Sequence, residues 1–144
     1  MKLALALAFC FATPSTVLPA HVSGITIHWV DGDSGTIGDH RFRLADVDAP
    51  EIGAVGSSRG AKCESERLLG QKAHRLMRHL SKNATVQLSV VGKTDRYGRL
   101  VVVMKVDGKN LAELGTRAGY LRPWPHRAGK ALSPKPDWCT LPRH

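Results

Sequence analysis

Five short segments rich in β-branched and apolar residues, each bounded by turn-forming residues, predict β-strands. The clearest is RFRLADV at 41–47, in which Phe42 and Leu44 alternate with arginines, as in a half-buried strand. In ATVQLSVV, at 84–91, every second residue from Val86 is apolar, which predicts a strand with one buried face. The five expected strands are 25–30, 36–37, 41–47, 84–91 and 100–106.

Two segments show the longer period of a helix. In the segment 61–82, five apolar residues fall on one helical stripe, and basic residues occupy the opposite face. The stripe consists of Leu69, Ala73, Leu76, Met77 and Leu80. A shorter helix is expected at 111–118, because Asn110 with Glu113 forms a capping pattern and Gly119 suits its far end.

The order of elements indicates the fold class. Three strands, a long helix, two strands and a short helix follow one another, which is the order of the OB-fold, a five-stranded Greek-key barrel. We therefore expect an α+β domain, mainly β, with the long helix between strands three and four. The segment 122–144 has several prolines and no apolar stripe, so we expect an irregular C-terminal tail.

The first twenty residues have the layout of a secretory signal peptide. Lys2 precedes an apolar run, Pro14 breaks that run, and Ala20 offers a small residue for cleavage. A buried N-terminal helix is the alternative, but Pro14 and the lack of a polar face argue against it. We expect 1–20 to be removed and the protein to be periplasmic or secreted.

Length and charge narrow the function classes. The chain has 144 residues, with 21 Lys+Arg against 12 Asp+Glu and a formal net charge of +9. This length suits one domain, and the charge favours acidic partners. No apolar stretch is long enough to span a bilayer. We expect a monomer without stable membrane association.

Export changes the interpretation of the cysteines. Cleavage after residue 20 would leave Cys63 and Cys139, which allow one intramolecular disulfide in an oxidising compartment. Two free buried thiols are the alternative. A zinc site is less favoured, because no CxxC motif or Cys-His cluster supplies four ligands.

Acidic residues are few, and four of them cluster at the ends of the first and third expected strands. They are Asp31, Asp33, Asp48 and Glu51. Carboxylates that converge in this way need a cation or basic groups, and hard oxygen ligands favour Ca²⁺ or Mg²⁺ over zinc. Arg43 and Arg99 lie on the adjoining strands and could bind a phosphate. Together these groups suit phosphodiester cleavage, although each motif alone could be a turn or a strand end.

Four motifs in one order resemble the thermonuclease family, the staphylococcal-nuclease-like domains. They are DGDS at 31–34, FRL at 42–44, VDAPE at 47–51 and DRYGR at 95–99, and the resemblance covers roughly 25–121. It implies an OB-type barrel within a domain at 21–121. It also implies Ca²⁺-dependent hydrolysis of DNA and RNA that leaves 3′-phosphate ends.

The resemblance also implies roles for individual residues. Asp33 and Asp48 would bind Ca²⁺ with the backbone carbonyl of Ala49. Glu51 would orient or deprotonate the attacking water, and Asp31 would orient the site through a hydrogen bond.

Further implied roles concern the substrate. Arg43 and Arg99 would hold the scissile phosphate, while Arg96 and Tyr97 resemble positions that contact the flanking phosphate. Trp124 is the best candidate for a base-stacking platform; the alternative is that it pins the tail to the barrel.

These observations predict an exported, sugar-nonspecific nuclease that acts on DNA and RNA, with single strands preferred and Ca²⁺ as cofactor. The alternative is a non-catalytic OB-fold module that binds nucleic acid without cutting it.

Overall fold

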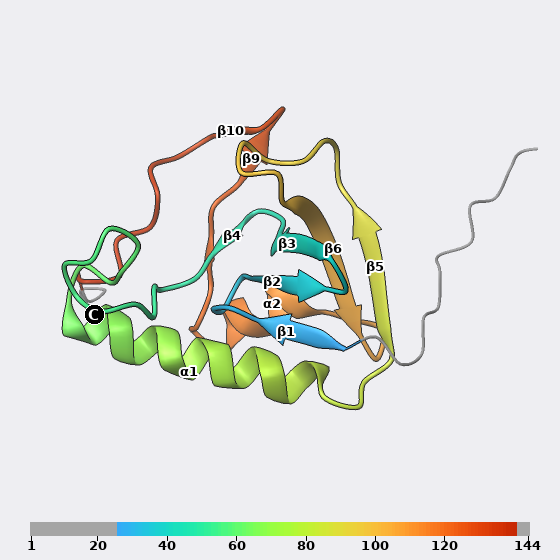
Figure 1. The fold of residues 1–144 in the computed structure, drawn as a ribbon, viewed down its shortest axis with the longest axis horizontal. Coiled ribbons are helices and arrows are strands. Elements are labelled where there is room, and N and C mark those ends of the chain that lie inside the picture. Colours follow the sequence, from blue (N-terminus) through green and yellow to red (C-terminus); the bar gives the residue numbers. More distant parts are fainter. Residues whose placement is uncertain (1–25, 141–144) are drawn as a thin grey trace, which may run out of the picture.

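The computed structural model describes residues 26–140, so the expected signal peptide at 1–20 lies outside the described residues. A curled sheet of six strands is packed against two helices (Figure 1). The strands follow the order β1-β2-β3-β6-β5, and β7 pairs with β6. Their bounds are β1 (Ile27–Trp29), β2 (Ser34–Ile37), β3 (His40–Leu44), β5 (Val86–Val90), β6 (Leu100–Val106) and β7 (Lys109–Asn110).

One strand pair in this sheet is parallel. Phe42 of β3 pairs with Leu100 of β6, whereas the other pairs are antiparallel. The connection between β3 and β6 runs through the helix α1 (Glu64–Ser81) and β5. The pairing path ends at β1 and β5, so the described chain forms a curled half-barrel. This arrangement, with α2 (Leu111–Arg117) following β7, confirms the expected α+β fold of OB type.

The core lies between the concave face of the sheet and the helices. The ring of Trp29 meets that of Phe42 edge to face, with 5.3 Å between their centroids. The apolar stripe of α1 faces this cluster, and its residues Ala73 and Met77 are completely buried. Burial of a side chain the size of Met77 contributes about 1.5–3 kcal/mol, so this stripe anchors α1 to the sheet.

Several element boundaries differ by one to three residues from those expected, and two of the differences lie near the site. The strand expected at 41–47 is interrupted, because Asp46 adopts a positive φ of 57° and the chain resumes as β4 (Val47–Asp48). The long helix begins at Glu64 rather than at 61. The cap of α2 is confirmed, since Asn110 Oδ1 accepts a hydrogen bond of 3.0 Å from the N–H of Ala112.

The tail contains more regular structure than expected. β8 (Arg122–Pro123) pairs with β4, and β9 (His126–Arg127) pairs with β10 (Lys130–Ala131). Figure 1 shows this segment, orange to red, leaving α2, turning at β9 and β10, and returning to the start of α1. Strands of two residues are too short to produce a periodic pattern, so the sequence could not predict them. Between residues 26 and 140, neither helix is long and apolar enough to cross a membrane.

Candidate functional site

The turn between β1 and β2 fixes the position of Asp33. The Asp31 carboxylate accepts hydrogen bonds from the N–H groups of Asp33 (3.0 Å) and Ser34 (2.7 Å) and from the Ser34 hydroxyl (2.9 Å). The turn also packs closely on its neighbours, because a Cβ added to Gly32 would lie 2.9 Å from the Cβ of Ala49. Asp31 therefore orients this turn through hydrogen bonds, and its role in the site stays a prediction.

Asp33 and Asp48 are both buried, with 8% and 3% of their surface exposed. Arg43 Nη2 lies 3.5 Å from Asp33 Oδ2 and donates to the Val47 carbonyl at 2.8 Å. Burial and the charge of Asp31 raise the pKa of Asp33 well above its ordinary value, and Asp48 adds to this effect while Arg43 opposes it. The site therefore holds two neighbouring carboxylates, for which one arginine only partly compensates.

Two residues of the tail contact Asp48, one of them also contacts Glu51, and the sequence did not predict these contacts. The Trp138 Nε1 donates to Asp48 Oδ2 at 2.8 Å. The ammonium of Lys135 lies 3.4 Å from Asp48 Oδ1 and 2.8 Å from Glu51 Oε1. Burial raises the pKa of Asp48, and the contacts with Trp138 and Lys135 oppose that rise. Burial would lower the pKa of Lys135, but the hydrogen bond to Glu51 and the two carboxylate charges outweigh it and raise the pKa.

Helix α1 positions the segment that carries Glu51. A Cβ added to Gly70 would lie 2.6 Å from the carbonyl oxygens of Pro50 and Glu51, so only glycine allows this approach. The buried Glu66 accepts hydrogen bonds from the backbone N–H groups of Glu51 (3.4 Å) and Lys62 (2.7 Å). Sequence reasoning missed both residues, although an acid in the first turn of a helix, as in a capping box, was a usable indication for Glu66.

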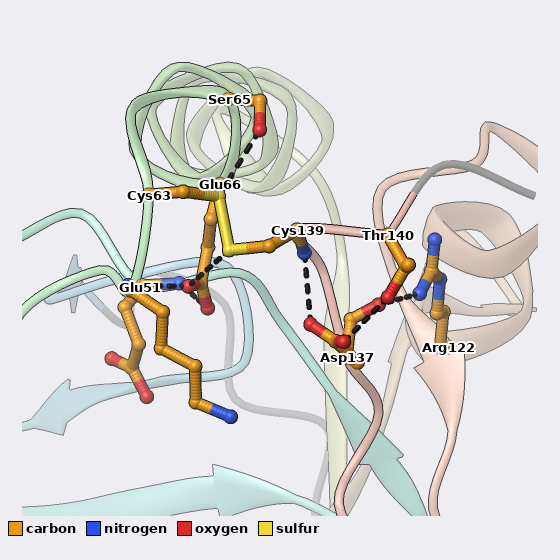
Figure 2. The surroundings of a disulfide bond; sticks show 9 residues. Glu51, Cys63, Ser65, Glu66, Arg122, Asp137, Cys139 and Thr140 are labelled. Atoms are coloured by element: carbon orange, nitrogen blue, oxygen red, sulfur yellow. Dashed lines mark hydrogen bonds between the residues drawn. A yellow bond between two sulfur atoms is a disulfide. The ribbon is translucent and has the colours of Figure 1, made fainter.

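The disulfide between Cys63 and Cys139 is confirmed, and it joins the start of α1 to the tail (Figure 2). Its sulfurs lie within 4.8 Å of a Glu66 oxygen, a grouping that could in principle hold a metal. Because the sulfurs are bonded to each other, they are not free thiolate ligands. The chemistry of this corner is therefore that of a structural cross-link.

The turn at 95–99 holds three residues to which the resemblance gives substrate roles. The Asp95 carboxylate accepts from the N–H groups of Tyr97 and Arg99, both at 2.9 Å, and pairs with Arg99 Nε at 2.8 Å. The Arg96 guanidinium stacks over the Tyr97 ring at 4.7 Å, and Tyr97 is 55% exposed. The ion pair of Arg99 is thus made within its own turn, whereas Arg43 reaches the buried carboxylate of Asp33 directly.

Trp124 lies between the sheet and the tail. Its Nε1 donates to the Ser133 carbonyl at 3.0 Å, and its backbone N–H donates to the Asp46 carbonyl at 2.8 Å. The Arg43 guanidinium lies 5.2 Å from the centroid of the Trp124 ring. These contacts support the alternative in which Trp124 pins the tail, and a base-stacking role stays a prediction.

The donor set of the site suits a hard divalent cation that is held weakly. Asp33 and Asp48 offer buried carboxylate oxygens whose mutual repulsion such a cation would relieve. Within residues 26–140, however, Asp33, Asp48 and Glu51 do not gather their oxygens into a group as tight as the one around the disulfide. Two carboxylates make a small ligand set, so several positions on the cation would stay open to water and substrate.

The protein is an α+β domain with a half-barrel of OB type. Buried carboxylates and an arginine lie at the ends of its strands. Residues 41–128 match the family described as Staphylococcal nuclease homologue. The chain belongs to this family, which confirms the resemblance and indicates a nuclease-like or nucleic-acid-binding function; three of the four motifs lie in the matched range, and DGDS at 31–34 precedes it. A comparison with curated proteins finds no match. The matched range contains Arg43, Asp48, Glu51 and Arg99, and it ends before Lys135 and Trp138.

Proposed function

We propose that the protein is an exported, Ca²⁺-dependent, sugar-nonspecific nuclease that hydrolyses DNA and RNA to products with 3′-phosphate ends. The observation that carries the proposal is the buried pair of Asp33 and Asp48 beside Arg43, with Glu51 three residues further along the chain. Buried carboxylates that repel one another are costly for folding, and such groups concentrate at functional sites. Membership of the staphylococcal nuclease family supports a phosphodiester substrate for this arrangement.

Each residue of the site has a separate role in the proposed hydrolysis. Asp33 and Asp48, with the carbonyl of Ala49, would hold Ca²⁺, which when bound supplies a Lewis acid that stabilises charge on the phosphate oxygens. Glu51 accepts a hydrogen bond from the attacking water and either orients it or takes its proton. Arg43 donates to the equatorial oxygens of the phosphate, where negative charge accumulates in the transition state.

The turn at 95–99 supplies the remaining phosphate contacts. Arg99 holds the scissile phosphate by exchanging part of its pairing with Asp95 for the substrate, and Arg96 with Tyr97 meets the flanking phosphate. Tyr97 is well exposed, so it is available to a strand that passes over this turn. DNA and RNA share the phosphates that these residues would contact, which suits a nuclease that accepts both polymers without regard to sequence. We propose single strands as its preferred substrates.

The disulfide is compatible with an oxidising compartment outside the cytosol. With the expected signal peptide at 1–20, it supports a periplasmic or secreted protein.

The proposal is tested by incubating the purified protein with single-stranded DNA and RNA, in Ca²⁺ or in a chelator. We expect cleavage of both polymers in Ca²⁺ only, and a loss of roughly a hundredfold or more in rate for Glu51→Gln, since general acid–base catalysis contributes about 10²–10⁴-fold. Glu64→Gln is the matched control, because Glu64 pairs with Arg67 on the exposed side of α1. Cleavage that survives Glu51→Gln at the full rate would contradict the proposed role of this carboxylate.

One observation favours the alternative of a non-catalytic binding module. Lys135 and Trp138 already satisfy the oxygens of Asp48, and Lys135 pairs with Glu51. A site whose charges are neutralised internally could bind nucleic acid through its basic surface alone. Tight, salt-dependent binding of single-stranded DNA without cleavage in any divalent metal would establish this alternative.

A further inference from the structure

The last described part of the tail, residues 133–139, is held against the site at four points, and we call it the tail strap. At its start, the Ser133 carbonyl accepts from Trp124 Nε1 at 3.0 Å. Near its end, the Asp137 carbonyl accepts from Arg122 Nη1 at 2.5 Å. Trp138 donates to Asp48, and Cys139 is bonded to Cys63. The four anchors together fix the course of the strap across the carboxylates.

The sequence of the strap makes it stiff. Lys135 lies between Pro134 and Pro136, so the backbone on either side has a fixed φ, and Lys135 itself is restricted to extended conformations. The guanidinium of Arg122 also covers the Trp138 ring at 4.2 Å. A stiff, tethered segment loses little conformational entropy when its lysine docks, so its local concentration at the site is high.

The docked lysine contacts a carboxylate oxygen of Asp48 that a metal would need, and it also contacts Glu51, the residue proposed to act on the attacking water. Its ammonium touches Glu51 Oε1 at 2.8 Å and Asp48 Oδ1 at 3.4 Å, while the other oxygen of Asp48 is occupied by Trp138. Asp33 is paired with Arg43. Each of these three carboxylates therefore has a cation or a donor from the chain itself, and at Asp48 and Glu51 that partner comes from the strap.

We propose that Lys135 is a tethered internal cation that a divalent metal must displace from Asp48 and Glu51, so that the strap sets the metal affinity of the site. The proposal rests on the metal site of the proposed function. Side-chain rotation of Lys135, 40% of whose side chain is exposed, is enough to release both carboxylates while the disulfide and Trp138 stay in place.

The test is a measurement of metal affinity that does not depend on catalysis. Tb³⁺ is titrated into the oxidised protein, its luminescence is excited through the tryptophans, and Ca²⁺ affinity is obtained by competition. We expect Lys135→Met to bind both metals about tenfold more tightly, since removal of a competing charge from two partly exposed ion pairs changes affinity by roughly this factor. Lys135→Arg keeps the charge and is expected to keep the affinity of the parent protein.

Lys130→Met is the matched control, because Lys130 is an exposed lysine of the same tail on β10 and the change in net charge is identical. Circular dichroism and urea midpoints show that each variant is folded. Equal affinities of the parent protein and Lys135→Met, or a weaker variant, would overturn the proposal while leaving the metal site intact. Failure of every variant to bind either metal would overturn it together with the calcium site of the proposed function.

Discussion

The disulfide is expected to account for a large part of the stability of the described domain. The Cys63–Cys139 bond spans a sequence separation of 76 residues, and the closed loop contains the whole of α1, the six strands from β5 to β10, and α2. In the chain-entropy treatment, closing a loop of this length stabilises the folded state by about 4.5 kcal/mol at 25 °C. Small domains are typically stable by about 5–15 kcal/mol, so removal of the bond leaves the protein marginally folded.

The perturbation is the double substitution Cys63→Ser with Cys139→Ser, made in a chain in which Cys10 is also replaced by Ser. Equilibrium unfolding in urea, followed by circular dichroism, is expected to show a loss of about 3–5 kcal/mol relative to the Cys10→Ser parent. Reduction of the parent is expected to produce the same loss, whereas the double variant is insensitive to reductant. A loss below about 1 kcal/mol would refute the view that the bond stabilises the fold by tethering the tail.

Three further predictions concern the site. Gly70→Ala is expected to lower the free energy of unfolding by about 1–3 kcal/mol and to remove most of the cleavage rate, because the added Cβ would displace the carbonyl of Glu51. Urea unfolding measures the first effect and initial rates of cleavage measure the second. Trp138→Phe leaves a buried oxygen of Asp48 without its donor and is expected to lower the free energy of unfolding by about 1–3 kcal/mol. Burial raises the pKa of Asp33 above its ordinary value of 3.8. The folded protein is therefore more stable while this carboxyl is protonated, at low pH, and that contribution to the free energy of unfolding is lost as the pH rises through the raised pKa. Asp33→Asn should therefore stabilise the metal-free protein at neutral pH, with a gain that shrinks toward about pH 4, and an equal gain at both would contradict this assignment.

The fold could be predicted because its elements carry local patterns. The apolar stripe on α1 and the Asn110 cap of α2 are encoded within a few residues of one another, and the structure places both as expected. The four motifs also sufficed to identify the family, since their order is specific.

The contacts around Asp48 could not be predicted in the same way. Lys135 and Trp138 reach this carboxylate from about ninety residues away, through a proline-rich segment without any periodicity. Position 70 requires glycine only because the backbone of Pro50 and Glu51 approaches it closely, and no local sequence pattern indicates this approach. The contacts of the tail with Asp48 thus depend on long-range packing of an irregular segment, which the sequence pattern did not predict.

The central claim is that the site around Asp33, Asp48 and Glu51 hydrolyses phosphodiester bonds. The most direct measurement digests a 5′-labelled single-stranded oligonucleotide in Ca²⁺ and then treats the products with a 3′-phosphatase. The account predicts short products whose gel mobility shifts after phosphatase treatment, and their formation at a rate about a hundredfold lower or less with Glu51→Gln. Products with 3′-hydroxyl ends, or products made equally well by Glu51→Gln, would contradict it.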